Sequence, residues 1–599
     1  MLALGRRNWF VWIIICVLLF LILSIPGNKN NATTPGQDPA TPMPWRQRLN
    51  PATYIPGMKS KPPHPEDYLV QVKEDPHCEA MYGPDYIQHI VDNHIPYCES
   101  GSKSDMECFV THLNDPLCVV RGVAYTANPG EGNKKWAMDC KIRNLTTEIQ
   151  QDTTGQKARD LEKFQDVEDF HEYFYWTGVR MQLEQWNIGH GSSAPNTQVN
   201  GMKCDAKNND GKITLLVKRE TNHNVWHKLM ELWQAMVTLD AMEMAPWHPS
   251  GHLKLPNTPF LTAKERKNVQ VVFEDDDVGP VEMLWPLVTG NPPIRASTLN
   301  DTCLGTVILP LPGSSSPFWD SHWQDRDCHT KFLLEPFLRR IYRTLNMETH
   351  KRLTENTVVT IIDRKGTRKI WHLAEHVEHL RKNYPDVTFN VVDFATIPLR
   401  DQIETVRNTD VLVGAMGAGF THILFLPEDA TVVELMTPGT HYSGFRNLAK
   451  MRGLPYFTSH GLEEEVWKKT QQQAPAPSPE QKTAVAGVVN AVPVPAPESQ
   501  SQNNEVDWRT KVELKAAGEQ VHAKQQANPQ DVGGAGADAA AAAGAGAGSS
   551  AGTISKRHWQ NDEFLYYTDE MFTALVAAGI NGQLNRGLRS EDVKPLPHN

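Results

Sequence analysis

A glycine-rich turn between two apolar segments carries the strongest chemical signal in the chain. Residues 410–435 read DVLVGAMGAGFTHILFLPEDATVVEL, so Gly414, Gly417, Ala418 and Gly419 follow an apolar run typical of a buried strand. Small residues let a ligand approach the backbone, and the first amides of a following helix supply partial positive charge. The stretch therefore predicts a turn that holds a diphosphate, although glycines also occur in such turns for packing alone.

The segments around this turn alternate between patterns typical of strands and of helices. Helices are predicted at residues 372–383, through Gln402 and Val406, and from about Gly419. Strands are predicted at residues 357–363, 388–394, 410–415 and 430–436. Such alternation indicates a parallel sheet covered on both faces, and these sheets bind ligands at the carboxyl ends of their strands.

A second region of the same kind lies upstream. KITLLVKRE and VQVVFE predict strands at residues 212–220 and 269–274, and a helix is predicted between them from about Asn224 to Met242. A chain of 599 residues is too long for one ordinary core. We therefore expect an α/β fold with two Rossmann-like halves.

Several spaced motifs resemble those of glycosyltransferase family 61. Residues 410–435 resemble its strand, G-x-H-G-A-G-L-T-[NH], FLP and VVE signature, residues 357–370 its strand with two arginines, and NVWH at 224–227 its Asn-x-aromatic-His segment. GFRNLAKMRGLPYF and residues 556–588 resemble fungal members of its EGF-domain-specific O-linked N-acetylglucosamine transferase branch. The resemblance implies a GT-B arrangement, in which two Rossmann-like domains face a cleft and the nucleotide lies mainly on the C-terminal one.

The resemblance also implies which residues hold a nucleotide-sugar donor. Arg364 and Arg368 follow the strand at 357–363, and a guanidinium pair can bind a diphosphate and stabilise the charge that grows on a leaving group. Thr421, His422 and Glu434 complete the donor set, with Glu434 placed to accept hydrogen bonds from ribose hydroxyls. An arginine beside a strand end also commonly forms a structural ion pair.

One position departs from the family pattern. Met416 stands where the family usually has histidine before GAG, and a thioether cannot donate a hydrogen bond to a phosphate. The departure either shifts that role to a neighbour such as His422 or lowers activity. An inactive homologue is therefore an alternative.

His227 is the candidate general base, since histidine titrates in the range needed to accept a proton from an acceptor hydroxyl. Asn224, one turn earlier, is expected to orient it. Asp276, within the run Asp275–Asp277, is the rival: it could supply a carboxylate base or bind a divalent cation. The alternatives are a structural histidine and a solvated acidic turn.

The N-terminal residues predict a membrane anchor. Residues 9–25 form an uncharged apolar run after Arg6 and Arg7, which favours a cytosolic tail at 1–8 and a luminal remainder. A cleaved signal peptide is the alternative. Residues 26–65 are rich in Pro, Asn and Thr and are interpreted as a stem.

Cysteine usage agrees with an oxidising compartment. Apart from Cys16 in the apolar run, the cysteines are even in number and none forms the close pairs of a zinc site, so disulfides are expected without a specified pairing. They are Cys78, Cys98, Cys108, Cys118, Cys140, Cys204, Cys303 and Cys328. Glycosylation sequons begin at Asn31, Asn144 and Asn300.

These observations predict the domain organisation. An N-terminal Rossmann-like, acceptor-side domain is expected at 66–330 and a nucleotide-sugar-binding domain at 331–470. A disordered low-complexity insertion at 471–552 and a C-terminal helical segment at 553–599 follow. A formal charge of −11 argues against a nucleic-acid partner.

The resemblance implies an inverting glycosyltransferase that moves a sugar, GlcNAc or xylose, from a UDP-sugar to a hydroxyl of a luminal protein or glycan. No cofactor is expected beyond the donor substrate, and metal is not expected to be required. The expected location is the Golgi or endoplasmic reticulum membrane, as a single-pass type II protein. A non-catalytic glycan-binding or chaperone-like homologue and a metal-dependent transferase built on Asp275–Asp277 are the alternatives.

Overall fold

The computed structural model describes most of the chain beyond its N-terminal segment, as eight ranges within the unit Ser60–Asn599. These ranges are 64–69, 73–207, 212–221, 223–245, 259–319, 323–347, 356–473 and 562–584. The predicted anchor at 9–25, nearly all of the stem and the sequon at Asn31 lie outside them. Within these ranges, no helix is both long enough and apolar enough to span a bilayer.

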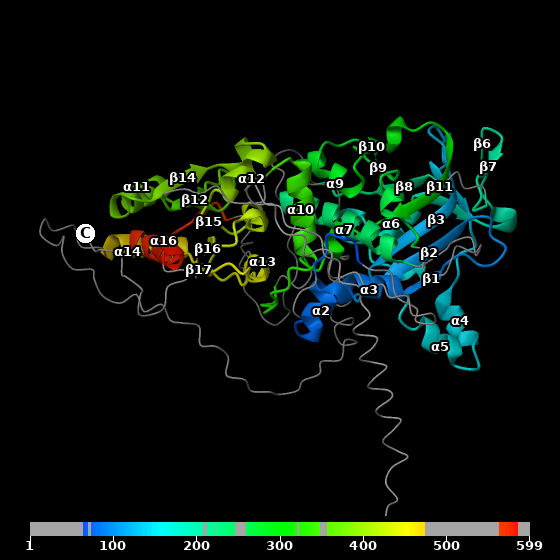
Figure 1. The fold of residues 1–599 in the computed structure, drawn as a ribbon, viewed down its shortest axis with the longest axis horizontal. Helices are drawn as coiled ribbons and strands as arrows, with labels where there is room; N and C mark the ends of the chain where they lie inside the picture. Colours follow the sequence, from blue (N-terminus) through cyan, green and yellow to red (C-terminus); the bar gives the residue numbers. More distant parts are fainter. Residues whose placement is uncertain are drawn as a thin grey trace, which may run out of the picture. The chain divides into compact units, whose positions relative to one another are not determined.

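The C-terminal part contains a five-stranded parallel sheet with the order β14-β12-β15-β16-β17 (Figure 1). Its strands are β12 (Val358–Ile362), β14 (Thr388–Val392), β15 (Val411–Ala415), β16 (Thr431–Met436) and β17 (Tyr456–His460). The first four match the predicted strands. The chain adds β14 on one side of β12 and β15 on the other, so β12 and β15 flank the point where the strand order reverses.

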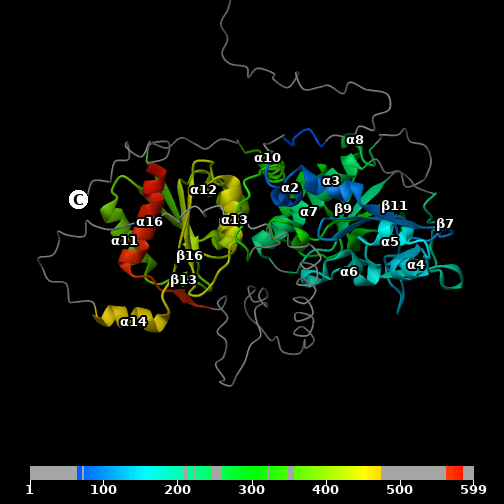
Figure 2. The ribbon, with the colours of Figure 1, turned by 90° about the horizontal axis from the view of Figure 1, so that it is seen from below.

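Helices cover both faces of this sheet, as the alternating pattern predicts. Val411, Val413 and Val433 pack with α11 (Leu373–Asn383) and α16 (Asp569–Leu584). The neighbouring residues Leu412 and Val432 face the other side of the sheet. They belong to a cluster that includes residues of α12 (Leu399–Arg407) and α13 (Gly444–Arg452). Figure 2 shows α16 and α11 together on one side of β16 and α12 and α13 on the other. This part is Rossmann-like.

The segment after the low-complexity region returns to this sheet. Strand β18 (Phe564–Leu565) pairs in parallel with β13 (Lys369–Ile370), and the next helix, α16, places Phe572, Val576 and Ile580 in the sheet's core. Helix α14 (Glu464–Gln473) includes the first three residues of the predicted insertion. The remainder of the insertion, residues 474–552, lies outside the described residues.

The N-terminal sheet differs from the prediction because it is mixed. Its main path is β1-β2-β3-β11-β8-β9-β10: the pairs among β1, β2, β3 and β11 are antiparallel, and those among β11, β8, β9 and β10 are parallel. Two further strands, β4 and β5, lie off this path, with β4 paired to β3 and β5 paired to β4. The strands of the sheet are β1 (His94–Pro96), β2 (Asp105–Val110), β3 (Pro116–Tyr125), β4 (Trp136–Asp139), β5 (Trp186–Gly189), β8 (Ile213–Val217), β9 (Gln270–Phe273), β10 (Ile294–Arg295) and β11 (Thr302–Leu309). The expectation of a Rossmann-like half therefore holds only for its parallel part.

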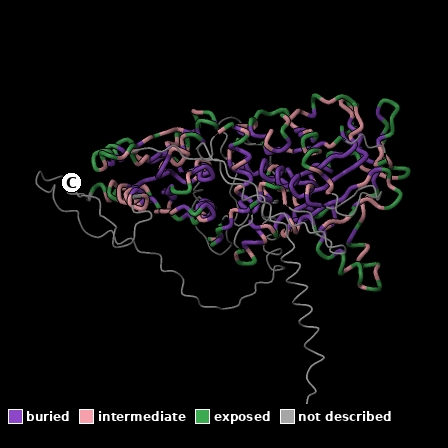
Figure 3. The backbone as a smooth tube through the Cα atoms, in the orientation of Figure 1, coloured by how far each residue is buried: buried purple, intermediate pink, exposed green. Residues whose placement is uncertain are grey.

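Helix α7 (Val225–Met244) follows β8 as predicted and is buried on nearly all sides, because it packs on the sheet and under other helices. Figure 3 shows buried residues concentrated along the strands and α7. The other helices are α2 (Pro76–Tyr82), α3 (Pro84–Asp92), α4 (Leu145–Gln151), α5 (Gln156–Leu161), α6 (Val179–Leu183), α8 (Ala263–Arg266), α9 (Pro286–Thr289) and α10 (Leu334–Thr344). A short antiparallel hairpin, β6 (Gln198–Val199) and β7 (Met202–Lys203), stands apart from the main sheet.

Disulfides tie this part together. All eight cysteines beyond Cys16 are paired, as expected for an oxidising compartment. The pairs are Cys78–Cys328, Cys98–Cys140, Cys108–Cys118 and Cys204–Cys303. The sequon residues Asn144 and Asn300 are exposed.

Candidate functional site

The glycine turn joins β15 to the predicted helix, η9 (Ala418–Phe425), which is a 3₁₀-helix. Gly417 precedes η9 with φ 144° and ψ −171°, a conformation that side chains with a Cβ rarely adopt. Gly417, Ala418 and Gly419 are partly exposed, whereas Gly414 is buried against Ile362. The turn therefore presents backbone at the carboxyl end of β15, as the sequence predicts.

Both predicted arginines lie against this turn. A Cβ atom at Gly417 would be 2.6 Å from Nη1 of Arg364 and 3.3 Å from Nη1 of Arg368. The Nε of Arg364 donates to the carbonyl of Thr367 at 2.9 Å, which fixes the guanidinium. Because Arg364 follows β12 and Gly417 follows β15, the two meet where the strand order reverses, the usual ligand position in such sheets.

The returning C-terminal segment holds the backbone of Arg368. The amide of Arg368 donates to the carbonyl of Asp562 at 2.6 Å, and that of Lys369 to the carbonyl of Glu563 at 2.9 Å. Arg368 has φ 57°, an uncommon value for a non-glycine residue. Strand pairing with residues far along the chain thus supports an unfavourable backbone conformation beside the turn. The sequence carries no local signal for this contact.

Glu434 lies within β16, two residues before its end, opposite Gly414 in the neighbouring strand, and is fully buried. The hydroxyl of Tyr456 donates to its Oε2. Burial raises the pKa of Glu434 to about 8, against the hydrogen bond from Tyr456 and the charges of Arg446 and Arg368, which lower it. The residue expected to accept hydrogen bonds from ribose is therefore a buried carboxyl group that is largely protonated at neutral pH.

His422 and Thr421 are buried within η9. The Nδ1 of His422 lies 2.9 Å from the carbonyl oxygen of Gly419, and its ring packs 4.5 Å from that of Phe394. Burial lowers the pKa of His422 to about 4, only partly offset by this hydrogen bond. A neutral, enclosed imidazole is poorly suited to the phosphate contact that Met416 cannot make.

Met416 also points into the apolar core. It is buried in the cluster that contains Phe420 and Phe445. The side chain at this position therefore contributes to packing in this structure.

His227, in the first turn of α7, contacts a carboxylate. Its Nδ1 lies 2.5 Å from Oε2 of Glu220, and both side chains are buried. The Nζ of Lys228 donates to the carbonyl of Glu220, and the amide of Glu220 donates to Glu231, so this residue is held in place. A carboxylate on one ring nitrogen orients the imidazole and stabilises its protonated form, as a general base requires.

The side chain of Asn224 binds the backbone at the start of α7. It is the N-cap of α7, and its side-chain oxygen accepts a hydrogen bond from the amide of Trp226 at 2.9 Å. Glu220 is the residue seen next to Nδ1 of His227. Sequence reasoning missed it, although an acidic residue after the strand and seven positions before His227 was visible.

Aromatic contacts connect α7 with the glycine turn. The ring of Trp226 lies 6.3 Å from that of Phe445 in α13, and Phe445 lies 5.5 Å from Phe420 in η9. The candidate base and the glycine turn thus belong to neighbouring elements, although they are almost two hundred residues apart in the sequence.

The aspartate run is engaged in polar contacts. Nε of Arg219 donates to Asp275 at 3.0 Å; burial raises the pKa of Asp275, but the hydrogen bond and charge of Arg219 outweigh it, and the net pKa is lowered. The exposed Asp276 accepts a hydrogen bond from Ser297, and Asp277 lies 3.6 Å from Nε2 of His223. These contacts give Asp275 a structural role and leave Asp276 at the surface.

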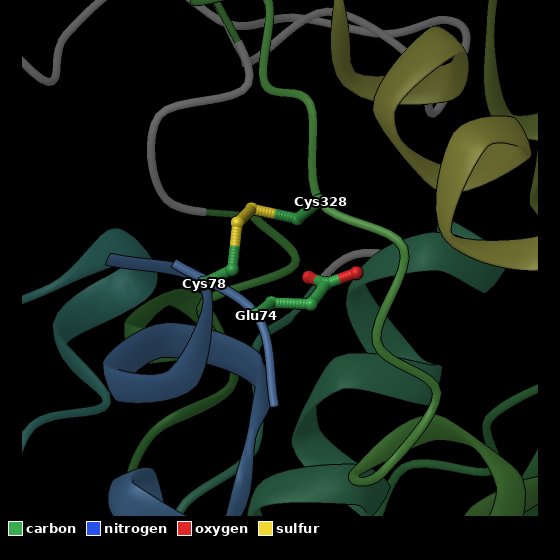
Figure 4. Close-up of side chains that lie close together, drawn as sticks. All are labelled: Glu74, Cys78 and Cys328. Carbon is green, nitrogen blue, oxygen red and sulfur yellow. A yellow bond between two sulfur atoms is a disulfide. The ribbon is translucent and has the colours of Figure 1, made fainter. Parts of the chain in front are cut away.

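Among the described residues, Glu74, Cys78 and Cys328 are the one group whose ligand atoms lie close enough for a metal ion. Figure 4 shows that the two sulfur atoms form a disulfide. The carboxylate of Glu74 accepts hydrogen bonds from the amide of His329 at 2.9 and 3.1 Å. The group therefore acts as a covalent and hydrogen-bonded junction.

Comparison with known proteins identifies the same region. Residues 301–433 match the family model described as Glycosyltransferase 61. This range includes Arg364, Arg368 and the glycine turn, and it excludes His227.

The chain is also similar to proteins named EGF domain-specific O-linked N-acetylglucosamine transferase. Identity is 34% over 134 residues with that of Xenopus laevis, covering 22% of this chain and 25% of the relative. It is 30% over 151 residues with that of Gallus gallus, covering 25% and 26%, and 40% over 67 residues with that of Drosophila melanogaster, covering 11% and 13%. The matched part thus spans about a quarter or less of each relative.

Proposed function

Because the chain belongs to glycosyltransferase family 61, we propose that it transfers a sugar from a UDP-sugar to a hydroxyl group with inversion. The observation that carries the proposal is the position of Arg364 and Arg368 against Gly417. Two cations beside exposed backbone at a strand-order reversal form a site for a diphosphate. In this proposal the two sheets take a GT-B arrangement, with residues 331–470 on the donor side and 66–330 on the acceptor side.

On the donor side, the two guanidinium groups bind the diphosphate and neutralise the charge that grows on it as the bond from the anomeric carbon to the phosphate oxygen breaks. The backbone of Gly417 lies beside them, and a Cβ atom at this residue would overlap with the guanidinium of Arg364.

On the acceptor side, His227 accepts the hydroxyl proton while the acceptor oxygen forms its bond to the anomeric carbon. The proton goes to the imidazole, the nucleoside diphosphate leaves from the opposite face, and Glu220 stabilises the resulting imidazolium from Nδ1. This assigns roles to both ring nitrogens without a metal ion.

The names of the relatives favour N-acetylglucosamine as the sugar and a protein domain as the acceptor. The paired cysteines favour an oxidising compartment, in agreement with a type II protein of the endoplasmic reticulum or Golgi membrane. Transfer of xylose to a glycan is the alternative within the same chemistry.

The test is nucleoside diphosphate release from UDP-GlcNAc, UDP-xylose and GDP-sugars by the full chain, with and without excess EDTA. We expect release from one UDP-sugar that persists in EDTA and is lost in the Arg364→Ala/Arg368→Ala double variant. Release that requires a divalent cation would favour the aspartate run instead. No release from any donor would contradict the proposed function.

A catalytically inactive homologue is the second candidate, and Met416 is the observation that favours it. The burial of Met416 in the apolar cluster argues against it, since the side chain there faces the core. Binding of a UDP-sugar without release of the nucleoside diphosphate, unchanged in Met416→His, would favour the inactive homologue. We expect release in the wild type and no gain in Met416→His, whereas a large gain would identify a lost catalytic contact.

A further inference from the structure

A short loop beside the candidate base has an unusual backbone. Residues 173–176, here the aromatic loop, consist of Tyr173, Phe174, Tyr175 and Trp176, the last three forming η3 (Phe174–Trp176). Tyr173, Tyr175 and Trp176 have φ values of 59°, 57° and 53°. Positive φ is rare for bulky residues, and clusters of such residues occur where the surrounding structure enforces them, commonly at functional sites.

The protein enforces this conformation at both ends of the loop. The hydroxyl of Tyr173 donates to the buried carboxylate of Asp115. The amide of Gly178 donates to the carbonyl of Glu172 at 3.1 Å, and a Cβ atom at Gly178 would overlap with the carbonyl oxygen of His171. The loop is thus a fixed element of the surface.

Its rings lie next to His227. Phe174 stacks on Trp319 with centroids 5.6 Å apart and an interplanar angle of 15°, and the ring of Trp319 lies 4.0 Å from that of His227. The ring of Tyr175 also contacts that of His227, with centroids 6.3 Å apart. Despite these contacts, Phe174 is 39% exposed and Trp176 is 52% exposed. Two large rings of the loop therefore face solvent, and one of them, Phe174, is linked to the imidazole through Trp319.

We propose that the aromatic loop binds the acceptor, and that this acceptor is a polypeptide. The inference rests on the proposed function, because an acceptor hydroxyl bound at His227 would lie beside the rings of Trp319 and Tyr175, which contact the imidazole. Exposed Trp, Tyr and Phe on a rigid backbone are typical anchors at protein interfaces, where they contribute apolar area at little entropic cost. The rings that face solvent are apolar, whereas a small polar ligand is oriented by several converging polar groups.

The test uses the full chain with an EGF-like domain that carries one acceptor hydroxyl, and with methyl β-xyloside as a small carbohydrate probe. Binding of the domain is measured by biolayer interferometry in the presence of UDP, so it does not depend on turnover. The variants are Trp176→Ala and Phe174→Ala. Met202→Ala is the control, because Met202 is 59% exposed in the separate hairpin β6–β7. Thermal melting verifies that each variant folds.

We expect the Kd for the EGF-like domain to rise at least tenfold in both aromatic variants and to stay within twofold in Met202→Ala. Unchanged binding in Trp176→Ala and Phe174→Ala would overturn the inference. Wild-type protein that binds or modifies the xyloside but not the domain would overturn the polypeptide assignment. Absence of UDP release in the wild type would contradict the proposed function alone, since domain binding would still decide the role of the loop.

Discussion

The Nδ1 atom of His227 lies 2.5 Å from Oε2 of Glu220, and both side chains are buried. The pair joins the first turn of α7 to the segment after β8. A carboxylate in this position fixes the orientation of the imidazole and stabilises its protonated form during proton transfer.

We therefore expect Glu220→Gln to lower kcat by about 10²-fold, and His227→Gln by about 10²- to 10⁴-fold, the usual contribution of a general base. The KM for the UDP-sugar should change little, because neither residue lies at the glycine turn. Steady-state transfer kinetics measure both quantities. Glu274→Gln is the control, since this partly buried carboxylate accepts a hydrogen bond from Gln182 and makes no contact with His227. A wild-type kcat in both Glu220→Gln and His227→Gln would exclude the proposed base.

The two arginines should contribute separately to catalysis. We expect Arg364→Ala and Arg368→Ala each to lower kcat/KM for UDP release by about 5- to 150-fold, or about 1–3 kcal/mol of transition-state stabilisation. Lys365→Ala removes an exposed cation from the same segment, paired with Asp363, and should have almost no effect. If all three variants lowered kcat/KM equally, the arginines would act through the overall positive charge of the segment and not through specific contacts with the diphosphate.

The backbone at Gly417 should not tolerate a side chain. A Cβ atom there would meet both guanidinium groups, so we expect Gly417→Ala to weaken UDP binding at least tenfold by isothermal titration calorimetry. Gly453→Ala controls for backbone strain, because Gly453 has φ 70° but open space around its Cβ position. It should cost about 1 kcal/mol of stability and leave UDP affinity unchanged. Unchanged UDP affinity in Gly417→Ala would place the nucleotide elsewhere.

The buried Glu434 predicts a pH-dependent stability. Its pKa in the folded protein is about 8, above the value of an exposed glutamate, so the folded state binds the proton more tightly and stability falls as pH rises from about 4.5 to 8. Glu434→Gln keeps an acceptor for Tyr456 but cannot ionise. Over this pH range, the free energy of unfolding of the wild type should fall by on the order of 1–3 kcal/mol more than that of Glu434→Gln. Thermal melting from pH 5 to 8 compares the two proteins. If the stability of both changed equally with pH, Glu434 would not titrate in this range.

Disulfide loss should depend on the loop that each bridge closes. Cys78 and Cys328 are 250 residues apart, and Cys108 and Cys118 are 10 apart. In the chain-entropy model, removal of the longer bridge by paired Cys→Ala substitutions should cost about 3 kcal/mol more. Thermal denaturation of the two double variants tests this order. A larger loss for the short bridge would show that local packing in β2 and β3 outweighs loop entropy.

Local patterns in the sequence were sufficient to predict the C-terminal parallel sheet. Strands β12, β15 and β16 lie where apolar runs predict them, because a strand buried on both faces needs apolar residues throughout. The edge strand β14 also lies where it is predicted, although it is only partly buried. The turn at Gly417 was visible for a similar reason, since only glycine adopts its backbone readily and allows the approach of Arg364 and Arg368. The spacing of those arginines after β12 placed them at the correct end of the sheet.

Contacts between distant segments decided the rest. The antiparallel strands at 94–125 follow no helix-strand alternation, so the mixed sheet depends on pairing that local periodicity does not encode. The amide of Arg368 finds its partner at Asp562, beyond the low-complexity region, and Glu220 reaches His227 only after β8 and α7 pack together. Burial is likewise a property of the assembled core. It made His422 a poor phosphate ligand and Glu434 a protonated acid, because the free energy of a charge depends on the surroundings that folding creates.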